Sequence, residues 1–257
     1  MLDTIVAAVE ARLPAVVARY DEYRSAAGVT DRSFAAALSG PGVSIIAEVK
    51  RRSPSRGTLN ADLDPAGQAA LYEQGGAAAI SVLTEHDHFG GSPDDLRLVR
   101  GVVGVPVLRK DFIIHPSQVW ESAAMGADAI LLIVAILDDA MLLSLLTEAT
   151  GAGLPALVEV HSAEEVARAQ GVGAKIIGVN NRNLRTFEVD LTTAEQLAPL
   201  LGAGVQRVAE SGIHSPEDVA RMAAAGYDAV LVGESLVRAE DPSELVGRFV
   251  AAGARCG

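Results

Sequence analysis

The stretch Gly126-Ala127-Asp128-Ala129-Ile130-Leu131-Leu132 decides the fold, because a close copy recurs later in the chain as Gly226-Tyr227-Asp228-Ala229-Val230-Leu231-Val232. In each copy a glycine ends a helix, and a short turn leads into an apolar strand. Looser copies are Gly75-Gly76-Ala77-Ala78 and Gly173-Ala174-Lys175-Ile176. The repeat predicts a chain in which helices alternate with buried strands.

From Ser44 onward the pattern of strand, turn and helix repeats. The expected strands are 44–50, 78–83, 106–109, 129–133, 156–160, 176–180, 206–211 and 229–233. The expected helices are 65–74, 93–99, 117–125, 138–149, 163–170, 192–200 and 216–225, and N-cap serines precede three of them, Ser92, Ser162 and Ser215. Buried strands that alternate with helices require a parallel sheet. Eight such units predict an α/β fold of the (β/α)8 TIM barrel class, with an open doubly wound sheet as the alternative.

The residues before the first strand predict an N-terminal helical extension, 1–43, on a single barrel domain, 1–257. Apolar residues recur at helical spacing in Leu2, Ile5, Val6, Val9 and Leu13. Pro14 is expected to end or kink this helix, and a second helical piece follows through Arg24. Packing alone could explain the extension.

Composition limits the classes of function. The chain has 257 residues, 21 Lys plus Arg and 33 Asp plus Glu, so its net charge is −12. This excess of acid disfavours nucleic acid and anionic membranes, and a phosphorylated ligand would need a local cluster of donors. A lone cysteine, Cys256, excludes a disulfide framework, and no apolar run approaches the roughly 20 residues of a membrane-spanning helix. We expect a cytoplasmic protein without a signal peptide.

Charged side chains stand at the ends of the expected strands. In the first strand, alternation places Ile46, Glu48 and Lys50 on one face, and buried charges are costly unless they are paired or used. Other strands end in Thr84-Glu85, Arg109-Lys110-Asp111, Glu159, Asn180-Asn181-Arg182, Glu210-Ser211-Gly212 and Gly233-Glu234-Ser235. In a barrel these groups would converge on one mouth, where the pKa values of lysines and carboxylates can be shifted.

Small residues after the last two strands predict a phosphate site. Ser211-Gly212 and Gly233-Glu234-Ser235 allow backbone N–H groups to approach an anion, and Glu234 to Val237 can form a short extra helix. The basic loop 51–59 could close over an anionic ligand, although a solvated loop is the simpler interpretation for Arg51 and Arg56. Phe89, Phe112, Leu131 and Leu184 could wall an aromatic ring, or belong to the core.

Other chemistries find little support. His86-Asp87-His88 lacks a third metal ligand at a suitable spacing and is interpreted as an exposed turn, so we expect no metal. His115, His161 and His214 precede or begin helices and pair with no candidate nucleophile. Ser211 lies outside a Gly-x-Ser-x-Gly motif, which disfavours acyl transfer.

Seven motifs together resemble indole-3-glycerol phosphate synthase of tryptophan biosynthesis: IAEVKRRSPS (46–55), SVLTE (81–85), VLRKDF (107–112), LVEVH (157–161), IGVNNRNL (177–184), AESGI (209–213) and LVGESL (231–236). The resemblance implies a TIM-barrel lyase that converts 1-(o-carboxyphenylamino)-1-deoxyribulose 5-phosphate into indole-3-glycerol phosphate, carbon dioxide and water. It implies no metal and no organic cofactor. The loop at His86 to His88 and the extension 1–43 depart most from the family.

The resemblance also implies roles for individual residues. Lys110 resembles the general acid that protonates the substrate carbonyl or its departing hydroxyl, Glu159 its acid–base partner, and Glu48 with Lys50 the pair for dehydration. The remaining residues implied as catalytic are Asn180, Glu210 and Ser211; substrate contacts are implied for Ser53 and Arg182, and phosphate contacts for Ser211, Gly212, Gly233 and Ser235. To these we add the strand-end residues Phe89, Phe112, Leu131 and Leu184 as expected substrate contacts and Lys50 as an expected phosphate contact. The division of acid and base duties among the two lysines and their carboxylates stays open.

Two alternatives remain open from the sequence. A phosphoribosyl isomerase on the same barrel would need only one acid and one base, and a non-catalytic phosphate-binding subunit would have no use for buried charges. The expected partner is a phosphorylated small molecule, not nucleic acid or membrane. We expect a monomer, with association with other tryptophan-pathway enzymes as an open alternative.

Overall fold

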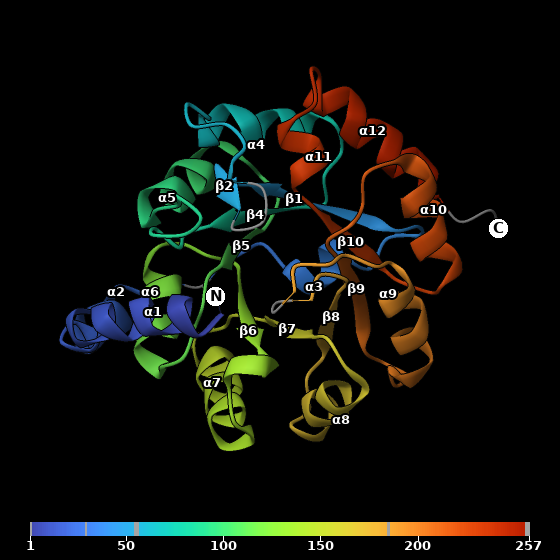
Figure 1. Ribbon diagram of the computed structural model, residues 1–257. Coiled ribbons are helices and arrows are strands. Elements are labelled where there is room, and N and C mark those ends of the chain that lie inside the picture. Colours follow the sequence, from blue (N-terminus) through green and yellow to red (C-terminus); the bar gives the residue numbers. More distant parts are fainter. Residues whose placement is uncertain (1, 29, 54–56, 184–185, 255–257) are drawn as a thin grey trace.

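The strands form a closed barrel. The computed structural model describes residues 2–28, 30–53, 57–183 and 186–254. Eight parallel strands of this described chain close into one ring, with β1 pairing with both β4 and β10 (Figure 1). Their bounds are β1 (Ser44–Val49), β4 (Ala79–Leu83), β5 (Val107–Lys110), β6 (Ala129–Ile133), β7 (Ala156–Val160), β8 (Ile176–Asn180), β9 (Gln206–Glu210) and β10 (Ala229–Val232). The predicted TIM barrel is confirmed, and the open sheet is excluded.

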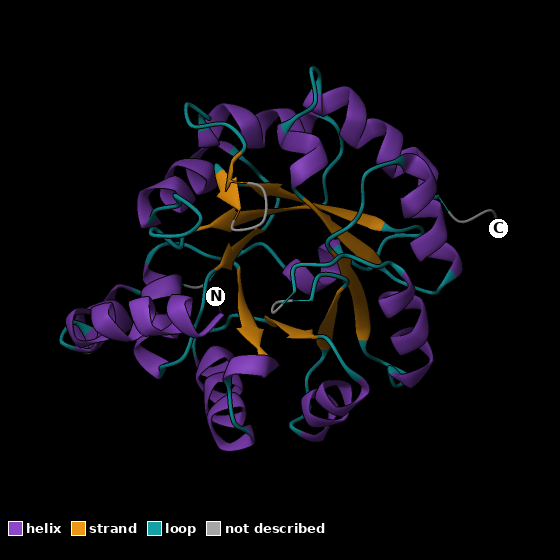
Figure 2. Cartoon of the chain, viewed as in Figure 1, coloured by secondary structure: helices purple, strands orange, loops and turns teal. Residues whose placement is uncertain are grey.

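Helices surround the strands, as Figure 2 shows in purple and orange. They are α4 (Pro65–Gln74), α5 (Pro93–Val102), α6 (Pro116–Ala124), α7 (Asp139–Gly151), α8 (Ala163–Gly171), α9 (Thr192–Leu197), α10 (Pro216–Ala224), α11 (Glu234–Val237) and α12 (Pro242–Ala252). Two 3-10 turns, η1 (Val134–Ile136) and η2 (Ala198–Leu200), and a small hairpin of β2 (Arg52–Ser53) with β3 (Gly57–Thr58) complete the connections.

The predicted strand and helix boundaries from Ser44 onward either match the observed ones or differ from them by one to three residues, and two differences have a clear cause. Ser211 was predicted inside a strand, but its φ of 64° takes it out of the extended region, so β9 ends at Glu210. The helix predicted to reach Leu200 changes to a 3-10 turn at Ala198, because Pro199 has no amide hydrogen to donate. The predicted serine N-caps are confirmed: Ser92, Ser162 and Ser215 each accept the N–H three residues on.

Alternation along the strands produces two apolar layers. Ile46, Leu108 and Leu231 point into the barrel and belong to an inner cluster of buried side chains. Their strand neighbours Ala47 and Val230 point outward and pack against the helices in a second cluster. Because side chains alternate between these layers, every second residue of a strand end faces the mouth of the barrel.

The N-terminal extension lies across both ends of the barrel. In α1 (Leu2–Val17), Ile5 and Val9 join the inner cluster above the strand ends, while α2 (Tyr20–Ala26) packs on α6. At the opposite end, α3 (Phe34–Ala37) buries Phe34 against the strand starts, and the Ser44 hydroxyl donates to the carbonyl of Ala37 at 3.2 Å. Pro14 was expected to end or kink this helix; it does not end it, because the helix continues to Val17 with the proline inside.

Candidate active site

A cavity opens at the C-terminal ends of the strands, where a TIM barrel carries its chemistry. Five of its charged lining side chains come from four separate strands or the residues directly after them: Glu48 and Lys50, Lys110, Glu159, and Glu210. The cavity is also lined by the predicted residues Ser53, Phe89, Phe112, Leu131, Asn180, Arg182, Ser211, Gly212 and Gly233. The sequence-based expectation that these groups meet at one mouth is therefore confirmed.

Two predicted residues stand apart from this group. Ser235 is not among the residues that line the cavity in the described chain, and its hydroxyl donates to the carbonyl of Ile213 at 3.1 Å. Its neighbours Gly233 and Glu234 do line the cavity. Leu184 lies outside the residues that the structure describes.

Lys110 is the centre of the charged cluster. Its Nζ lies 3.2 Å from Glu159 Oε2 and 3.2 Å from Glu210 Oε2, and all three side chains are largely buried. Gly178, on β8, makes room for this arrangement, because a Cβ at that position would lie 2.0 Å from Glu210 Oε1. The cluster thus places two carboxylates against one ammonium in a space that excludes most water.

Burial and mutual charge shift the pKa values of these three groups. Burial raises the pKa of Glu210 to about 7, with Glu159 adding to the shift and Lys110 opposing it. Burial alone would lower the pKa of Lys110, but Glu210, Glu159 and Glu48 together raise it, so the ammonium stays charged. The pKa of Glu159 is lowered despite its burial, because Lys110 and His161 stabilise the carboxylate. At neutral pH Lys110 is therefore an ammonium, and Glu210 is close to the midpoint of its titration, so that its carboxyl group is partly protonated.

A second ion pair joins Lys50 to Glu48 in the same cavity. Glu48 is buried, and Lys50 is mostly so. Gly233, at the end of β10, permits the pair to lie there, since a Cβ at that position would be 3.0 Å from Lys50 Nζ and closer still to Glu48. The end of the first strand therefore places the Glu48 carboxylate and the Lys50 ammonium on the side of the cavity next to Gly233.

An apolar wall lies beside the charges. The rings of Phe89 and Phe112 are 6.1 Å apart and tilted by 36°, and Leu131 is buried near them in the inner cluster. Leu2 and Ile5 of α1 also line the cavity. An aromatic ring could be held between these groups while its polar substituents reach the lysines.

The loops after β9 and β10 form a polar edge of small residues. Ser211 and Gly212 both adopt positive φ angles, of 64° and 81°. The left-handed conformation is unfavourable for serine, so the surrounding structure must stabilise it. The short helix α11 begins at Glu234, as predicted, directly after Gly233. Small residues and the start of a short helix thus meet at this edge, an arrangement in which backbone N–H groups can approach an anion.

The family model for indole-3-glycerol phosphate synthase matches residues 2–249. The chain belongs to the indole-3-glycerol phosphate synthase family. The enzyme of that name from Kineococcus radiotolerans is 59% identical over 213 residues, which is 83% of this chain and 78% of that protein. Indole-3-glycerol phosphate synthase 1 from Streptomyces coelicolor is 53% identical over 257 residues, covering 98% and 96% of the two chains.

Among solved structures, thiamine phosphate pyrophosphorylase from Pyrococcus furiosus matches with a TM-score of 0.63 at 16% identity, over 84% of this chain and 96% of that one. At this identity the likeness concerns the barrel fold alone. The predicted function, an indole-3-glycerol phosphate synthase and hence a carbon–carbon lyase, is confirmed by the family match and the relatives. The isomerase and the non-catalytic subunit are not favoured.

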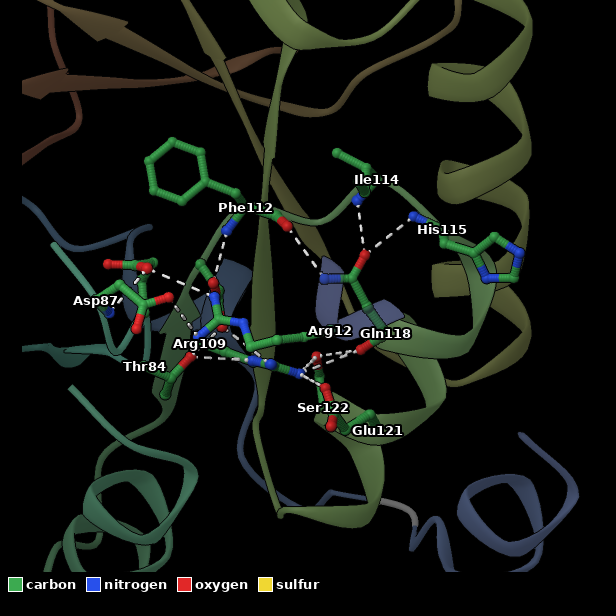
Figure 3. A network of polar contacts seen from close by, with 12 residues as sticks. Arg12, Thr84, Asp87, Arg109, Phe112, Ile114, His115, Gln118, Glu121 and Ser122 are labelled. Atoms are coloured by element: carbon green, nitrogen blue, oxygen red, sulfur yellow. Dashed lines mark hydrogen bonds and ion pairs between the residues drawn. The ribbon is translucent and has the colours of Figure 1, made fainter. Parts of the chain in front are cut away.

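Not every charged strand end of this family member faces the cavity. Arg109 points away from Lys110 into a buried network, in which it donates to Glu121 at 2.8 Å, Asp111 at 2.9 Å and Thr84 at 3.1 Å (Figure 3). Glu85 accepts the backbone N–H groups of the loop that carries Phe89. For Thr84, Glu85 and Arg109 the expectation was wrong. Alternation turns Thr84 and Arg109 outward, away from the mouth. Glu85 lies in the loop after β4, where the loop N–H groups hold its carboxylate.

Two basic features of the sequence are structural. Arg51 forms an ion pair with Asp95 and donates to the carbonyl of Gly90 at 3.3 Å, so it holds its loop rather than facing the cavity. Arg56 lies outside the described residues. His86 is exposed and contacts Asp87 at 2.9 Å, which agrees with an exposed turn.

Sequence reasoning missed several residues of the site. Leu2 and Ile5 were assigned to packing, Phe187 was not considered and His214 was set aside, yet all four line the cavity. His161 was set aside, but its ring lies against Glu159. Strand alternation was a usable signal, since His161 follows Glu159 by two residues and so returns to the same side of the chain.

Across the described residues, no helix is long and apolar enough to cross a membrane.

Proposed function

We propose that five charged side chains of this cavity carry the ring closure, decarboxylation and dehydration that define the indole-3-glycerol phosphate synthase reaction: Glu48, Lys50, Lys110, Glu159 and Glu210. The observation that carries the assignment is the position of Lys110 between Glu159 and Glu210, 3.2 Å from each, beside the Lys50–Glu48 pair. This set provides two cations and three carboxylates around one site, which an isomerase would not need.

Lys110 is assigned to the first step. Its charged ammonium protonates, or donates a hydrogen bond to, the substrate carbonyl oxygen as the ring carbon attacks. Glu159 keeps the ammonium oriented and charged. As a carboxylate it can take up a proton that the substrate releases in a later step and pass that proton to the neutral Lys110 amine, which restores the ammonium. Glu210 lies on the other side of Lys110, lines the product side with Ser211, and holds a proton near neutral pH because burial raises its pKa.

The Lys50–Glu48 pair is assigned to the later steps. The Lys50 ammonium attracts the substrate carboxylate, which leaves as carbon dioxide when the new ring carbon bond is in place. In the dehydration the departing hydroxyl needs a proton and the adjacent ring carbon must lose one, so an adjacent ammonium and carboxylate suit both transfers. Carbon dioxide, water and the aromatic indole result.

The remaining predicted residues are assigned to binding. The phosphate is held by the backbone at Ser211, Gly212, Gly233 and Ser235, with Lys50 supplying positive charge. Asn180 and Arg182 position substrate hydroxyls and the carboxylate, and Ser53 contacts the substrate from the first loop. The aromatic ring is held by Phe89, Phe112 and Leu131, with Leu184 as a further proposed contact.

We also assign the whole chain, 1–257, to one working domain, because Leu2 and Ile5 of the extension line the same cavity as the strand ends. The net charge of −12 supports a small phosphorylated substrate rather than nucleic acid as the partner. We further propose a monomer that works in the cytoplasm. The lone cysteine agrees with a reducing compartment, and the acid–base chemistry of the reaction requires no metal or organic cofactor. Association with other tryptophan-pathway enzymes stays open.

The decisive assay follows the purified protein with the proposed carboxyphenylamino substrate. Indole fluorescence should appear as indole-3-glycerol phosphate forms, and the rate should be unchanged by a metal chelator. Product isolation should show one carbon dioxide per indole. A protein that isomerises a phosphoribosyl substrate without indole formation would refute the assignment.

A further inference from the structure

His161 occupies a position beside the proposed acid–base group. It follows the last residue of β7, and its side chain is 15% exposed. The ring nitrogen Nε2 lies 3.7 Å from Glu159 Oε1, and Nδ1 lies 3.5 Å from Glu165 Oε2. Neither nitrogen makes a hydrogen bond within the described chain. The imidazole is therefore placed between two carboxylates at ion-pair separation.

Glu165 is itself fixed in place. It is the third residue of α8, where Ser162 Oγ accepts its backbone N–H at 3.2 Å. In return its Oε2 accepts the backbone N–H of His161 at 2.7 Å. This reciprocal arrangement at the helix start holds the outer carboxylate rigidly against the imidazole.

The two oxygens of Glu159 have different partners. Oε2 lies 3.2 Å from Lys110 Nζ, while Oε1 faces His161. We propose that His161, anchored by Glu165, is a positioning residue that holds Glu159 against Lys110 and sets the pH range in which this carboxylate is ionised. This inference rests on the proposed role of Glu159. It adds His161, a residue that the proposed function does not use.

The surrounding charges support this role. Glu159 is faced by Lys110 from β5, Glu210 from β9, Asn180 from β8 and His161 from its own connection. Burial alone would lower the pKa of His161, but Glu165, Glu159 and Glu210 raise it. A charged imidazole next to Glu159 favours the carboxylate, whereas Glu210 and burial oppose it.

The first test measures titration directly in the free enzyme. Carboxyl carbon NMR of glutamate-labelled protein would follow Glu159, with Glu159→Gln to assign its signal. In His161→Gln the Glu159 signal should titrate at higher pH than in wild type. Glu165→Gln retains the helix cap and should shift the Glu159 titration in the same direction by a smaller amount. In the double variant of His161→Gln and Glu165→Gln, the Glu159 titration should be the same as in His161→Gln alone. An unchanged Glu159 titration in both single variants would overturn the inference.

The second test is kinetic. The acid limb of the pH profile of kcat/KM should move upward by about one pH unit in His161→Gln, because an opposite charge at this separation is lost. His115→Asn is the matched control, since His115 also lies between a strand and a helix but caps α6 through Ser117 N–H at 3.2 Å. Its profile should match wild type. If the NMR titration moves and the kinetic limb does not, the proposed role of Glu159 fails while the link between His161 and Glu159 stands.

Discussion

Gly178 on β8 faces Glu210 on the neighbouring strand β9 so closely that a Cβ on Gly178 would lie 2.0 Å from Glu210 Oε1. The space for the Glu210 side chain is thus created by the missing side chain of another residue. Because Glu210 Oε2 lies 3.2 Å from Lys110, a change at Gly178 would affect Lys110 through the displaced Glu210 carboxylate.

The substitution Gly178→Ala should therefore lower kcat by about tenfold or more by displacing the Glu210 carboxylate from Lys110. The fold should be retained, because the displaced atom is the end of a flexible side chain. Gly101→Ala is the control: it adds a methyl group in open space on α5 and should raise stability by about 0.5–1 kcal/mol. Wild-type kcat in Gly178→Ala would contradict the proposed importance of this contact.

Replacement of Lys110 by alanine should lower turnover by at least about a hundredfold, since the site loses its proposed general acid. Indole fluorescence would measure the rate, and circular dichroism would check the fold. Lys175→Ala is a suitable control, because Lys175 is exposed directly before β8, at the opposite end of the barrel. Turnover near wild type in Lys110→Ala would remove this residue from its assigned role.

The pKa of Glu210 should make stability depend on pH. Burial raises this pKa from its ordinary 4.5 to about 7, so the folded state binds more protons than the unfolded state between these values. The free energy of unfolding should therefore fall as the pH rises from about 4.5 to about 7. From the difference between the two pKa values, the free energy of unfolding should fall by about 3 kcal/mol over this interval.

In Glu210→Gln this pH-dependent loss should be absent. Thermal or urea unfolding at several pH values would show wild type and variant diverging through that interval and running parallel above it. His161 titrates in both proteins, so its own contribution should largely cancel in the comparison. Stability curves that stay parallel from pH 4.5 upward would show that Glu210 is ionised throughout.

The Arg109 network should matter for stability rather than for proton transfer. Arg109→Met would leave the buried carboxylates of Asp111 and Glu121 without their cation, at a cost of about 3–5 kcal/mol. Arg97→Met, which breaks an exposed ion pair with Asp94, should cost less than about 1 kcal/mol. Urea unfolding would compare the two. Equal costs would mean that the buried network contributes no more than a surface pair.

Local patterns in the sequence were sufficient for the barrel. Period-two alternation and the repeated glycine turn depend only on neighbouring residues, so strands such as β6, β7 and β8 have their predicted bounds. The same alternation predicted that Glu48 and Lys50 point into the mouth. It also explains why Arg109 points outward while its neighbour Lys110 points inward. The prediction from sequence treated all charged residues at a strand end as one group and so missed this difference.

What the sequence by itself determined is which residues could reach the mouth of the barrel, because that follows from strand order and the side on which each residue lies. Only the tertiary structure decided that Lys110 lies between Glu159 and Glu210, that Gly178 makes room for Glu210, and that α1 lies along the cavity. These relations join residues far apart in the chain. The pKa values follow from them, since burial and charge separation depend on distances in space and not on spacing in the sequence.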